Sequence, residues 1–369
     1  MENVNTTNFQ ELFVNLLSKL SDREQEVLKQ RYHLTSDLAK KATLRQIGES
    51  YNITRERVRQ IEREAVRKLV KHAEAQEFAG ELKQIEVALG NHLERQGGLV
   101  REDHLLENYV NENYELDFLH SNAFLFVLEH VFDTVVRAGN HDKFYSVWAL
   151  KQIDLEKIAD LLGNVETHLN EQNKVHSPQE IVNVGVEKLS DELKSVLEKY
   201  SEKHSDREIK NFVENYIHSA SGIEKNILDQ WGLSNWDTIR PKKLSDKINL
   251  IFQNINDPLH FRDLAENIND AGFDHKKICA ATVHNELIAN KDFVLIGRGI
   301  YAPGEWGYST GTVSDIITKI LQDSEEPLSK DEIFNGVLKQ RKVNQSTIYL
   351  TLINKDKFAK TEDGRFTIK

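Results

Sequence analysis

The clearest alternation of apolar and polar positions in the chain lies in the segment Thr43–Leu69. Apolar residues recur at three- and four-residue steps on both sides of Asn52, a residue type that tolerates the left-handed conformation of a tight turn. Thr43 and Thr54 each precede such a run and are suited to cap a helix. The pattern predicts two helices joined by a turn, the second with an inward face formed by Val58, Ile61, Ala65 and Leu69.

The second helix of this pair would leave a polar, largely basic face outward. A DNA-reading helix-turn-helix requires this arrangement, because arginine can be bidentate to guanine, glutamine to adenine, and glutamate can accept from cytosine. The alternative interpretation is a solvated basic helix face without a partner. The outward residues are Arg55, Glu56, Arg59, Gln60 and Arg63.

The residues before this segment predict two further helices. Apolar positions at helical spacing indicate an amphipathic helix over Phe9–Leu20, and Ser21 with Glu24 forms the capping box of a second helix. A polar loop, His33–Ala42, follows. The opening of the chain therefore reads as a small four-helix bundle.

The next segment combines a helical pattern with a hairpin pattern. Two short apolar runs, FDTVV and KFYSVW, flank the turn-forming residues Arg137–Asp142. Helices followed by a hairpin indicate a winged helix. The aromatic residues of this segment are more consistent with a core than with base stacking; they are Phe124, Phe126, Phe132, Tyr145 and Trp148.

The segment from Asp154 to Pro241 is predicted to be helical and is rich in carboxylates. We expect Trp231 and Trp236 to pin its last helix to the following domain. An acidic spacer and a surface for a basic protein partner remain equally open interpretations.

The C-terminal third contains an internal repeat. Thr282, Phe293 and Gly299 recur at an offset of 65 residues, and Pro258-Leu259 recurs at an offset of 69. Each copy predicts three helices and a hairpin, the arrangement of a winged helix. Residues expected to face outward as secondary DNA contacts are His284, Asn285, Arg298, Gln345, Ser346, Tyr349 and Arg365. The alternative is a pair of protein-interaction modules, since both copies are nearly neutral.

Charge is distributed unevenly along the 369 residues, whose net charge is −11. The segment Ser21–Ala75 carries 13 Lys and Arg against 9 Asp and Glu, whereas Gln76–Lys242 carries 17 against 30. The basic helix-turn-helix therefore favours a nucleic-acid partner, and the acidic middle would be repelled by DNA.

Other classes of protein are disfavoured. The single cysteine, Cys279, excludes an internal disulfide framework, and no membrane span or signal-peptide pattern is visible. We find no phosphate loop, no metalloprotease motif and no spacing of the 14 histidines that suggests a metal. We therefore expect a cytoplasmic protein that is not an enzyme, with no metal, cofactor, small-molecule substrate or membrane partner.

The segment LSDREQEVLKQRYHLTSDLAKKATLRQIGESYNITRERVRQIEREAVRKL resembles region 4 of sigma-70 transcription initiation factors. The resemblance implies that its last helix enters the major groove of an upstream promoter element and that the domain docks on the flap of the RNA polymerase beta subunit. It aligns Arg55, Glu56, Arg59 and Gln60 with base-reading positions. His33 departs from the glycine usual in the family. Expected phosphate contacts are Thr43, Arg45, Arg57, Arg63, Arg67 and Lys68.

The first C-terminal copy, with its GRGIYAPGEWG wing, resembles the HARE helix-turn-helix family, which includes the N-terminal domain of the RNA polymerase delta subunit. The resemblance implies association with DNA or polymerase and supplies no catalytic residue.

These observations together predict a mainly α protein, a tandem array of helix-turn-helix and winged-helix domains with small β-hairpin wings. The expected function is a polymerase-associated transcription factor that reads a promoter-like element in double-stranded DNA. It lacks the family's promoter-melting module and so is not expected to be a complete sigma factor. The alternatives are a polymerase-binding or acidic protein-interaction scaffold and a DNA-specificity subunit of a defence system. The expected domains are 1–77 (sigma region 4-like), 78–151 (winged-helix-like), 152–242 (acidic, helical), 243–308 (HARE-type) and 309–369 (HARE-like).

Overall fold

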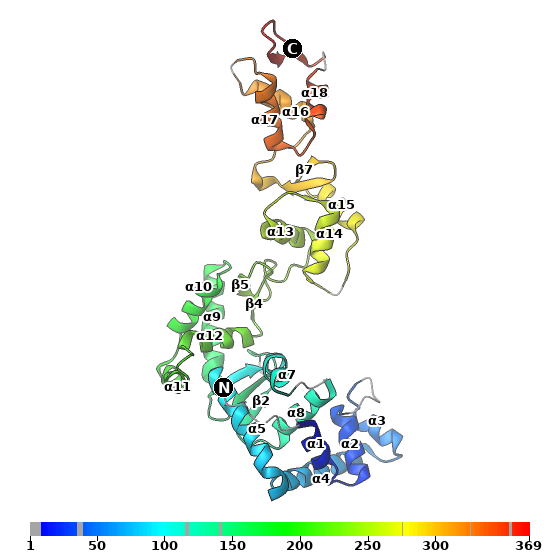
Figure 1. Ribbon diagram of the computed structural model, residues 1–369, viewed down its shortest axis with the longest axis vertical. Coiled ribbons are helices and arrows are strands. Elements are labelled where there is room, and N and C mark those ends of the chain that lie inside the picture. Colours follow the sequence, from blue (N-terminus) through cyan, green and yellow to red (C-terminus); the bar gives the residue numbers. More distant parts are fainter. Residues whose placement is uncertain are drawn as a thin grey trace. The chain divides into compact units, whose positions relative to one another are not determined.

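The computed structural model describes residues 9–34, 40–114, 118–139, 142–274, 276–324, 326–353 and 356–369. The chain divides into two compact units, Met1–Glu224 and Lys225–Lys369. Both are built mainly of α-helices with small antiparallel sheets, which confirms the predicted fold class (Figure 1).

The domain that contains the helix-turn-helix opens the first unit. Its helices are α1 (Phe9–Leu17), α2 (Asp22–Tyr32), α3 (Leu44–Ser50) and α4 (Arg55–Ala73), of which α3 and α4 form the helix-turn-helix. The predicted turn is confirmed, since Asn52 is left-handed with a φ of 54°. The α3–α4 pair closes over a small core in which Val27, Ile47 and Val58 are fully buried.

His33 ends α2 in the conformation that glycine usually supplies. Its φ of 57° is left-handed, and its backbone N–H donates to the carbonyl of Lys29. The departure from the family's glycine therefore leaves this helix end intact. Much of the polar loop that follows, 35–39, lies outside the described residues.

A mixed helix and sheet module follows. Its elements are α5 (Gln76–Arg95), β1 (Leu99–Arg101), α6 (Glu102–Leu105), the π-helical turn η1 (Leu106–Val110), α7 (Asn111–Tyr114), α8 (Phe118–His130), β2 (Val135–Ala138) and β3 (Val147–Leu150). The predicted hairpin is confirmed as β2 and β3, and β1 adds an unpredicted third strand on the far side of β3. Of the five aromatic residues expected in the core, all but the half-buried Tyr145 are buried.

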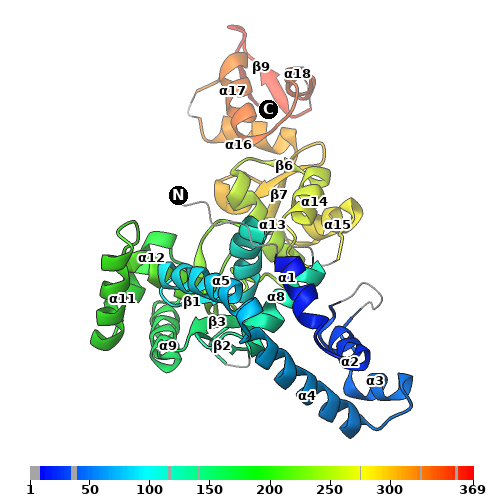
Figure 2. The ribbon, with the colours of Figure 1, turned by 60° about the horizontal axis from the view of Figure 1, so that its bottom comes forward.

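Helix α8 joins this module to the helix-turn-helix (Figure 2). The ring of Phe124 lies 5.2 Å from that of Phe9 on α1, and the ring of Phe126 lies 4.7 Å from that of Tyr32 on α2. Phe124 and Phe126 are both almost fully buried. The apolar face of α1 and the end of α2 therefore share a core with α8 and are not exposed.

The remainder of the first unit is helical up to residue 219. Its helices are α9 (Leu155–Gln172), α10 (Pro178–Glu187), α11 (Asp191–Lys203) and α12 (Ile209–Ser219). Buried Tyr216 on α12 donates to the Gly97 carbonyl before β1, which ties the helices to the preceding sheet. The expectation of helix up to Pro241 is wrong, because β4 (Ile223–Lys225) and β5 (Trp231–Leu233) pair there.

The second unit contains the two repeated copies. The first consists of α13 (Leu244–Ile255), β6 (Leu259–His260), α14 (Phe261–Asp270), α15 (Ala280–Ala289), β7 (Phe293–Gly297), β8 (Ile300–Pro303) and the 3-10 turn η2 (Gly304–Trp306). The second consists of α16 (Val313–Gln322), α17 (Lys330–Gln340), α18 (Gln345–Leu352), β9 (Phe358–Lys360) and β10 (Phe366–Ile368). Each copy has its own core, and both predicted hairpins are confirmed.

The pairing of strands supports the sequence alignment of the copies. Leu259 pairs with Tyr301 in the first copy, and Leu328 pairs with Phe366 in the second. These are the positions that the offsets of 69 and 65 residues place in correspondence. The two copies are therefore duplicates in structure as well as in sequence.

Candidate nucleic-acid interface

The N-terminal end of α4 presents the four expected base-reading residues on one exposed face. Thr54 caps the helix by accepting a hydrogen bond from the Arg57 backbone N–H at 3.2 Å, and no capping box is completed. Val58 is fully buried against α2 and α3. Because one side of the helix is fixed in this way, its other side carries Arg55, Glu56, Arg59 and Gln60 outward, all exposed.

Two of these residues are paired with each other. The Arg59 guanidinium donates to both carboxylate oxygens of Glu56, at 2.9 and 2.6 Å. This hydrogen bonding lowers the pKa of Glu56 below its ordinary value, so that the carboxylate is charged at neutral pH. Since both side chains are exposed, water screens the pair and a DNA base can compete for either group.

Arg57 and Gln60 form a second pair, with Nη1 of Arg57 donating to Oε1 of Gln60 at 3.2 Å. Arg55 is exposed and has no carboxylate partner in the part of the chain that the structure describes. The face therefore offers one guanidinium, that of Arg55, for which the described residues provide no ion pair, and two pairs that can open toward a base.

The expected phosphate contacts differ in how far they are already engaged. Arg45 is paired with Glu49, Arg67 with Glu64, and Lys68 with Glu24. The Thr43 hydroxyl is used within its own capping box, where it bonds Gln46. Arg63 is exposed and has no acidic partner among the residues described.

A cleft of about 330 Å³ lies between the start of α2 and the outward side of α4. It is lined by Arg57, Gln60, Glu64 and Lys68 from α4 and by Arg23 and Glu24 from α2. Arg23 was not predicted as a site residue. Its own segment gives no signal for it, because only the packing of α2 against α4 brings it beside the other cations.

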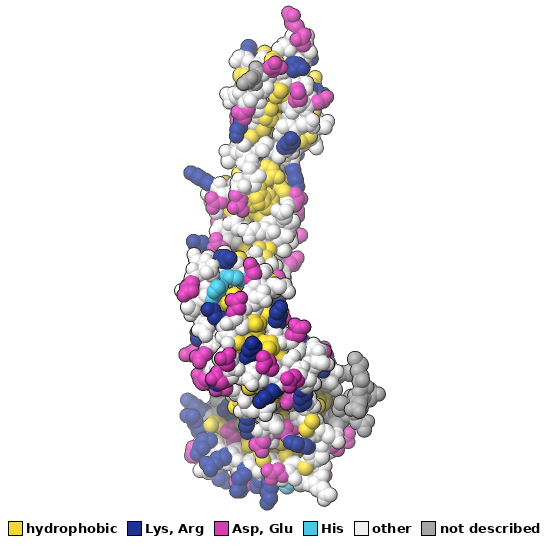
Figure 3. All heavy atoms as spheres, turned by 90° about the vertical axis from the view of Figure 1, so that its left-hand side faces the viewer, with side chains coloured by type: hydrophobic (Ala, Val, Ile, Leu, Met, Phe, Trp, Pro, Cys, Tyr) yellow, Lys and Arg dark blue, Asp and Glu magenta, His cyan; other side chains and the backbone are white. Residues whose placement is uncertain are grey.

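Basic side chains gather around this domain. Figure 3 shows Lys and Arg side chains concentrated at the lower end of the drawn face. The helix-turn-helix occupies that end in Figure 1. The basic side chains of the helix-turn-helix domain are thus on its surface, where they can contact DNA phosphates.

The residues expected as secondary contacts lie in the second unit. Asn285 and Arg298 are exposed in the first copy, and Arg298 precedes the left-handed Gly299 at the wing turn. His284 is half-buried, and its ring is stacked on that of Phe261 with centroids 4.5 Å apart. Its contact with DNA stays a prediction.

In the second copy, Gln345, Ser346 and Tyr349 are exposed on α18. Arg365 is exposed and donates to the Pro327 carbonyl at 3.1 Å. These residues lie on a helix and a wing of one copy, whereas the base-reading residues belong to the other unit.

The described part of the chain has neither a metal-binding cluster nor a membrane-spanning helix. Within the described residues, no three His, Cys, Asp or Glu side chains are grouped so that they could hold a metal ion. No described helix combines the length and the apolar character needed to cross a bilayer.

Comparison with known proteins identifies one segment. Residues 16–71 match the family model of sigma-70, region 4. The segment is 53% identical over 55 residues to the RNA polymerase sigma factor SigA of Microcystis aeruginosa, covering 15% of this chain and 13% of that protein.

Two further relatives are more distant. The sigma factor SigA of Clostridium acetobutylicum is 44% identical over 59 residues, and the sigma factor RpoD of Helicobacter pylori is 46% identical over 55 residues. The match to this SigA covers 16% of the present chain and 15% of the SigA. The match to RpoD covers 15% of the present chain and 8% of the RpoD. No solved structure matches the chain. Residues 16–71 therefore form a DNA-binding helix-turn-helix domain of the sigma-70 region 4 type.

Proposed function

We propose that this protein is a transcription factor associated with bacterial RNA polymerase, and that it reads a promoter-like element in duplex DNA with the start of α4. The exposed constellation of Arg55, Glu56, Arg59 and Gln60 is the observation that carries the proposal. These side chains can recognise guanine, cytosine and adenine by hydrogen bonds at base edges.

The cations around α2 and α4 would fix the register on the duplex. Arg23, Arg57 and Lys68 line one cleft, and Arg63 is exposed farther along α4. Phosphate contacts position a protein without specifying sequence, so these residues would set affinity and the base-reading residues would set preference.

Association with polymerase, including the beta flap, belongs to the same proposal. The chain spans only about 8 to 15% of the length of these sigma factors, so the similarity extends to the helix-turn-helix domain alone. Polymerase would have to approach a face of the domain that α8 leaves free, since α8 covers α1 and the end of α2. The C-terminal copies would act as HARE-type modules that extend this contact, and the protein would work in the cytoplasm on the nucleoid.

The test is selection from a random duplex library with the full chain at physiological salt, followed by affinity measurements on the enriched sequence. Arg59→Ala should lose about five- to a hundredfold in affinity for that sequence and relax the preference at one base pair. Arg67→Ala should weaken all sequences equally, because Arg67 is expected at phosphate.

Lys71→Ala is the matched control, since Lys71 is exposed near the end of α4 and is assigned no contact. It should leave the sequence preference unchanged. If no sequence is enriched, or if Arg59→Ala and Lys71→Ala behave alike, α4 does not read bases.

A protein-interaction scaffold is the second candidate. The segment Gln76–Lys242 carries 30 acidic and 17 basic residues, and this acidic surplus favours the scaffold. Polymerase that remains bound to the tagged protein after nuclease treatment would support the scaffold. Polymerase that is lost with the DNA would support the DNA-reading function.

A further inference from the structure

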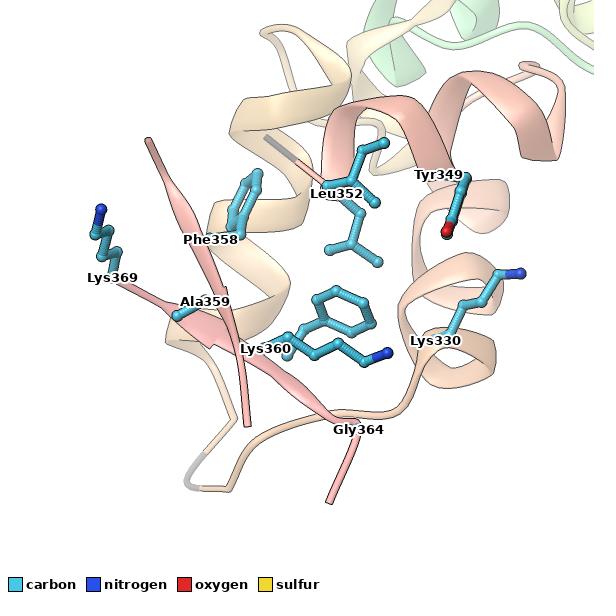
Figure 4. Close-up of a pocket in the computed structure, with 10 residues that line it drawn as sticks. Lys330, Tyr349, Leu352, Phe358, Ala359, Lys360, Gly364 and Lys369 are labelled. Carbon is cyan, nitrogen blue, oxygen red and sulfur yellow. The ribbon is translucent and has the colours of Figure 1, made fainter. Parts of the chain in front are cut away.

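The second C-terminal copy contains an open cleft of about 750 Å³ between α18, the start of α17 and the wing formed by β9 and β10. Its floor is apolar, with Leu352, Phe358 and Phe366 at 1%, 4% and 6% exposure. Figure 4 shows that Tyr349 and Lys330 enter from the two helices, whereas Lys360 enters from the wing.

The ionisable side chains that line this cleft carry positive charge. They are Lys330, Lys360 and Lys369, and among the residues that the structure describes no Asp, Glu or Arg lines it. Lys330 lies 4.8 Å from the ring centre of Tyr349, and Lys360 lies 5.8 Å from that of Phe366. Neither of these two lysines has a carboxylate partner among the described residues. The cleft thus combines an apolar floor with a rim on which Lys330 and Lys360 carry positive charge.

The first copy shows what the same position looks like when a ring fills it. By the repeat offsets, Lys330 corresponds to Phe261 and Tyr349 corresponds to His284. In the first copy these two rings stack at 4.5 Å. Replacement of the phenylalanine by lysine in the second copy removes a ring from this position and adds a charge.

The surface beside the cleft is also apolar. Leu350 on α18 and Ile353 directly after it are 66% and 46% exposed, and Tyr349 is 44% exposed. Aliphatic side chains on an outward helix face contact DNA mainly through thymine methyl groups and offer no hydrogen bond to a base. A bulky apolar anchor surrounded by charge is instead the usual centre of a protein interface.

We propose that this cleft is a docking site for another protein, through an acidic segment that carries a bulky apolar side chain. The apolar anchor enters between Tyr349 and Phe358, and carboxylates flanking it face Lys330 and Lys360. Complementary charge supplies orientation and specificity, while the buried anchor supplies most of the affinity. This site is independent of DNA reading by α4.

The experiment is selection from a displayed library of random peptides with the full-length protein, followed by fluorescence anisotropy of the best labelled peptide. We expect enriched peptides to contain acidic residues around a Trp, Phe or Leu. Replacing that anchor by alanine should weaken binding more than about 30-fold. Lys330→Glu and Lys360→Glu should each weaken binding by about three- to tenfold.

Three variants make the test specific. Lys339→Glu introduces the same charge change at an exposed position on α17 that does not line the cleft, and should leave binding unchanged. Lys330→Phe introduces the ring that the first copy has at this position. It should abolish binding of the labelled peptide while the circular dichroism spectrum stays the same. Arg59→Ala should have no effect, which separates this result from that of the DNA experiment.

Several outcomes would overturn the inference. Enriched peptides without acidic residues, or equal binding by the Lys330→Glu and Lys339→Glu variants, would rule out the cationic cleft. A labelled single-stranded oligonucleotide that binds with the same dependence on Lys330 would identify a nucleic-acid site. Self-association of the chain with that dependence would make the occupant a second copy.

Discussion

Gly48 provides a direct test of how the helix-turn-helix is held together. An added Cβ at Gly48 would lie 2.7 Å from the backbone carbonyl oxygen of Ile53 and 3.5 Å from the backbone nitrogen of Arg55. Both atoms belong to the backbone and cannot rotate away. The turn that leads into α4 would therefore have to shift by several tenths of an ångström.

The magnitude follows from two opposing effects. Alanine is favoured over glycine inside a helix by about 1 kcal/mol, whereas forcing a methyl group into a filled position costs about 1–3 kcal/mol. Gly48→Ala should therefore change the stability of this domain by between about zero and 2 kcal/mol, in the destabilising direction. Gly80 on α5 is the matched control, because its added Cβ would have no neighbour within 4 Å and Gly80→Ala should stabilise by up to about 1 kcal/mol.

Hydrogen exchange followed by mass spectrometry measures each effect locally, which suits a chain of several modules. Peptides from α3 and α4 should exchange faster in Gly48→Ala, and peptides from α5 should exchange more slowly in Gly80→Ala. DNA affinity should fall in Gly48→Ala alone, because the shifted turn displaces the reading residues. If Gly48→Ala slows exchange in α3 and α4 as much as Gly80→Ala slows it in α5, the methyl group at residue 48 does not collide with the Ile53 carbonyl, and the reasoning is refuted.

Three further predictions concern charge. Arg63→Ala should reduce the slope of log affinity for duplex DNA against log salt by about 1, measured by titration at several salt concentrations; an unchanged slope would remove Arg63 from the phosphate contacts. Glu86 accepts hydrogen bonds from the backbone N–H groups of Asp133 and Thr134, so Glu86→Ala, which removes the acceptor, should cost about 1–3 kcal/mol in unfolding measurements at neutral pH, and a neutral result would show that these bonds contribute nothing. Burial lowers the pKa of His92 to about 4, so its neutral form is favoured in the fold, and up to about 3 kcal/mol of stability should be lost as the pH falls from about 6.5 to 4. His92→Phe should flatten that dependence in unfolding curves, and an identical pH profile would contradict the assignment.

Local signals predicted most of the helical framework. Ser21, Thr43 and Ser177 begin helices where the capping pattern indicated, and each forms the capping box that its third helical residue permits. The hairpins were predictable because apolar runs flank turn-forming residues. These features depend on neighbours in sequence, so the sequence contains the information needed to find them.

Features that depend on distant contacts were missed. Strand β1 has only three residues, too few for an alternating pattern, and it exists because β3 pairs with it. Arg23 joins the cleft beside α4 only through the packing of α2, and His284 is half-buried only because Phe261 stacks on it. The pairing of Glu56 with Arg59 was within reach of the sequence, since residues three apart on a helix are neighbours.

The outward helices of the two ends of the chain differ in chemistry more than in geometry. The start of α4 exposes arginine, glutamate and glutamine, which can satisfy the hydrogen-bonding groups at base edges. The corresponding outward face of α18 exposes Tyr349, Leu350 and Ile353, which gain most by leaving water against another apolar surface. The first C-terminal copy has two stacked rings at the positions that Lys330 and Tyr349 occupy in the second copy, so the difference between Phe261 and Lys330 adds a positive charge beside the cleft. Under the two functions proposed here, the exposed helix of one module would contact DNA and that of the other would contact a protein, and the side chains on each helix would decide which.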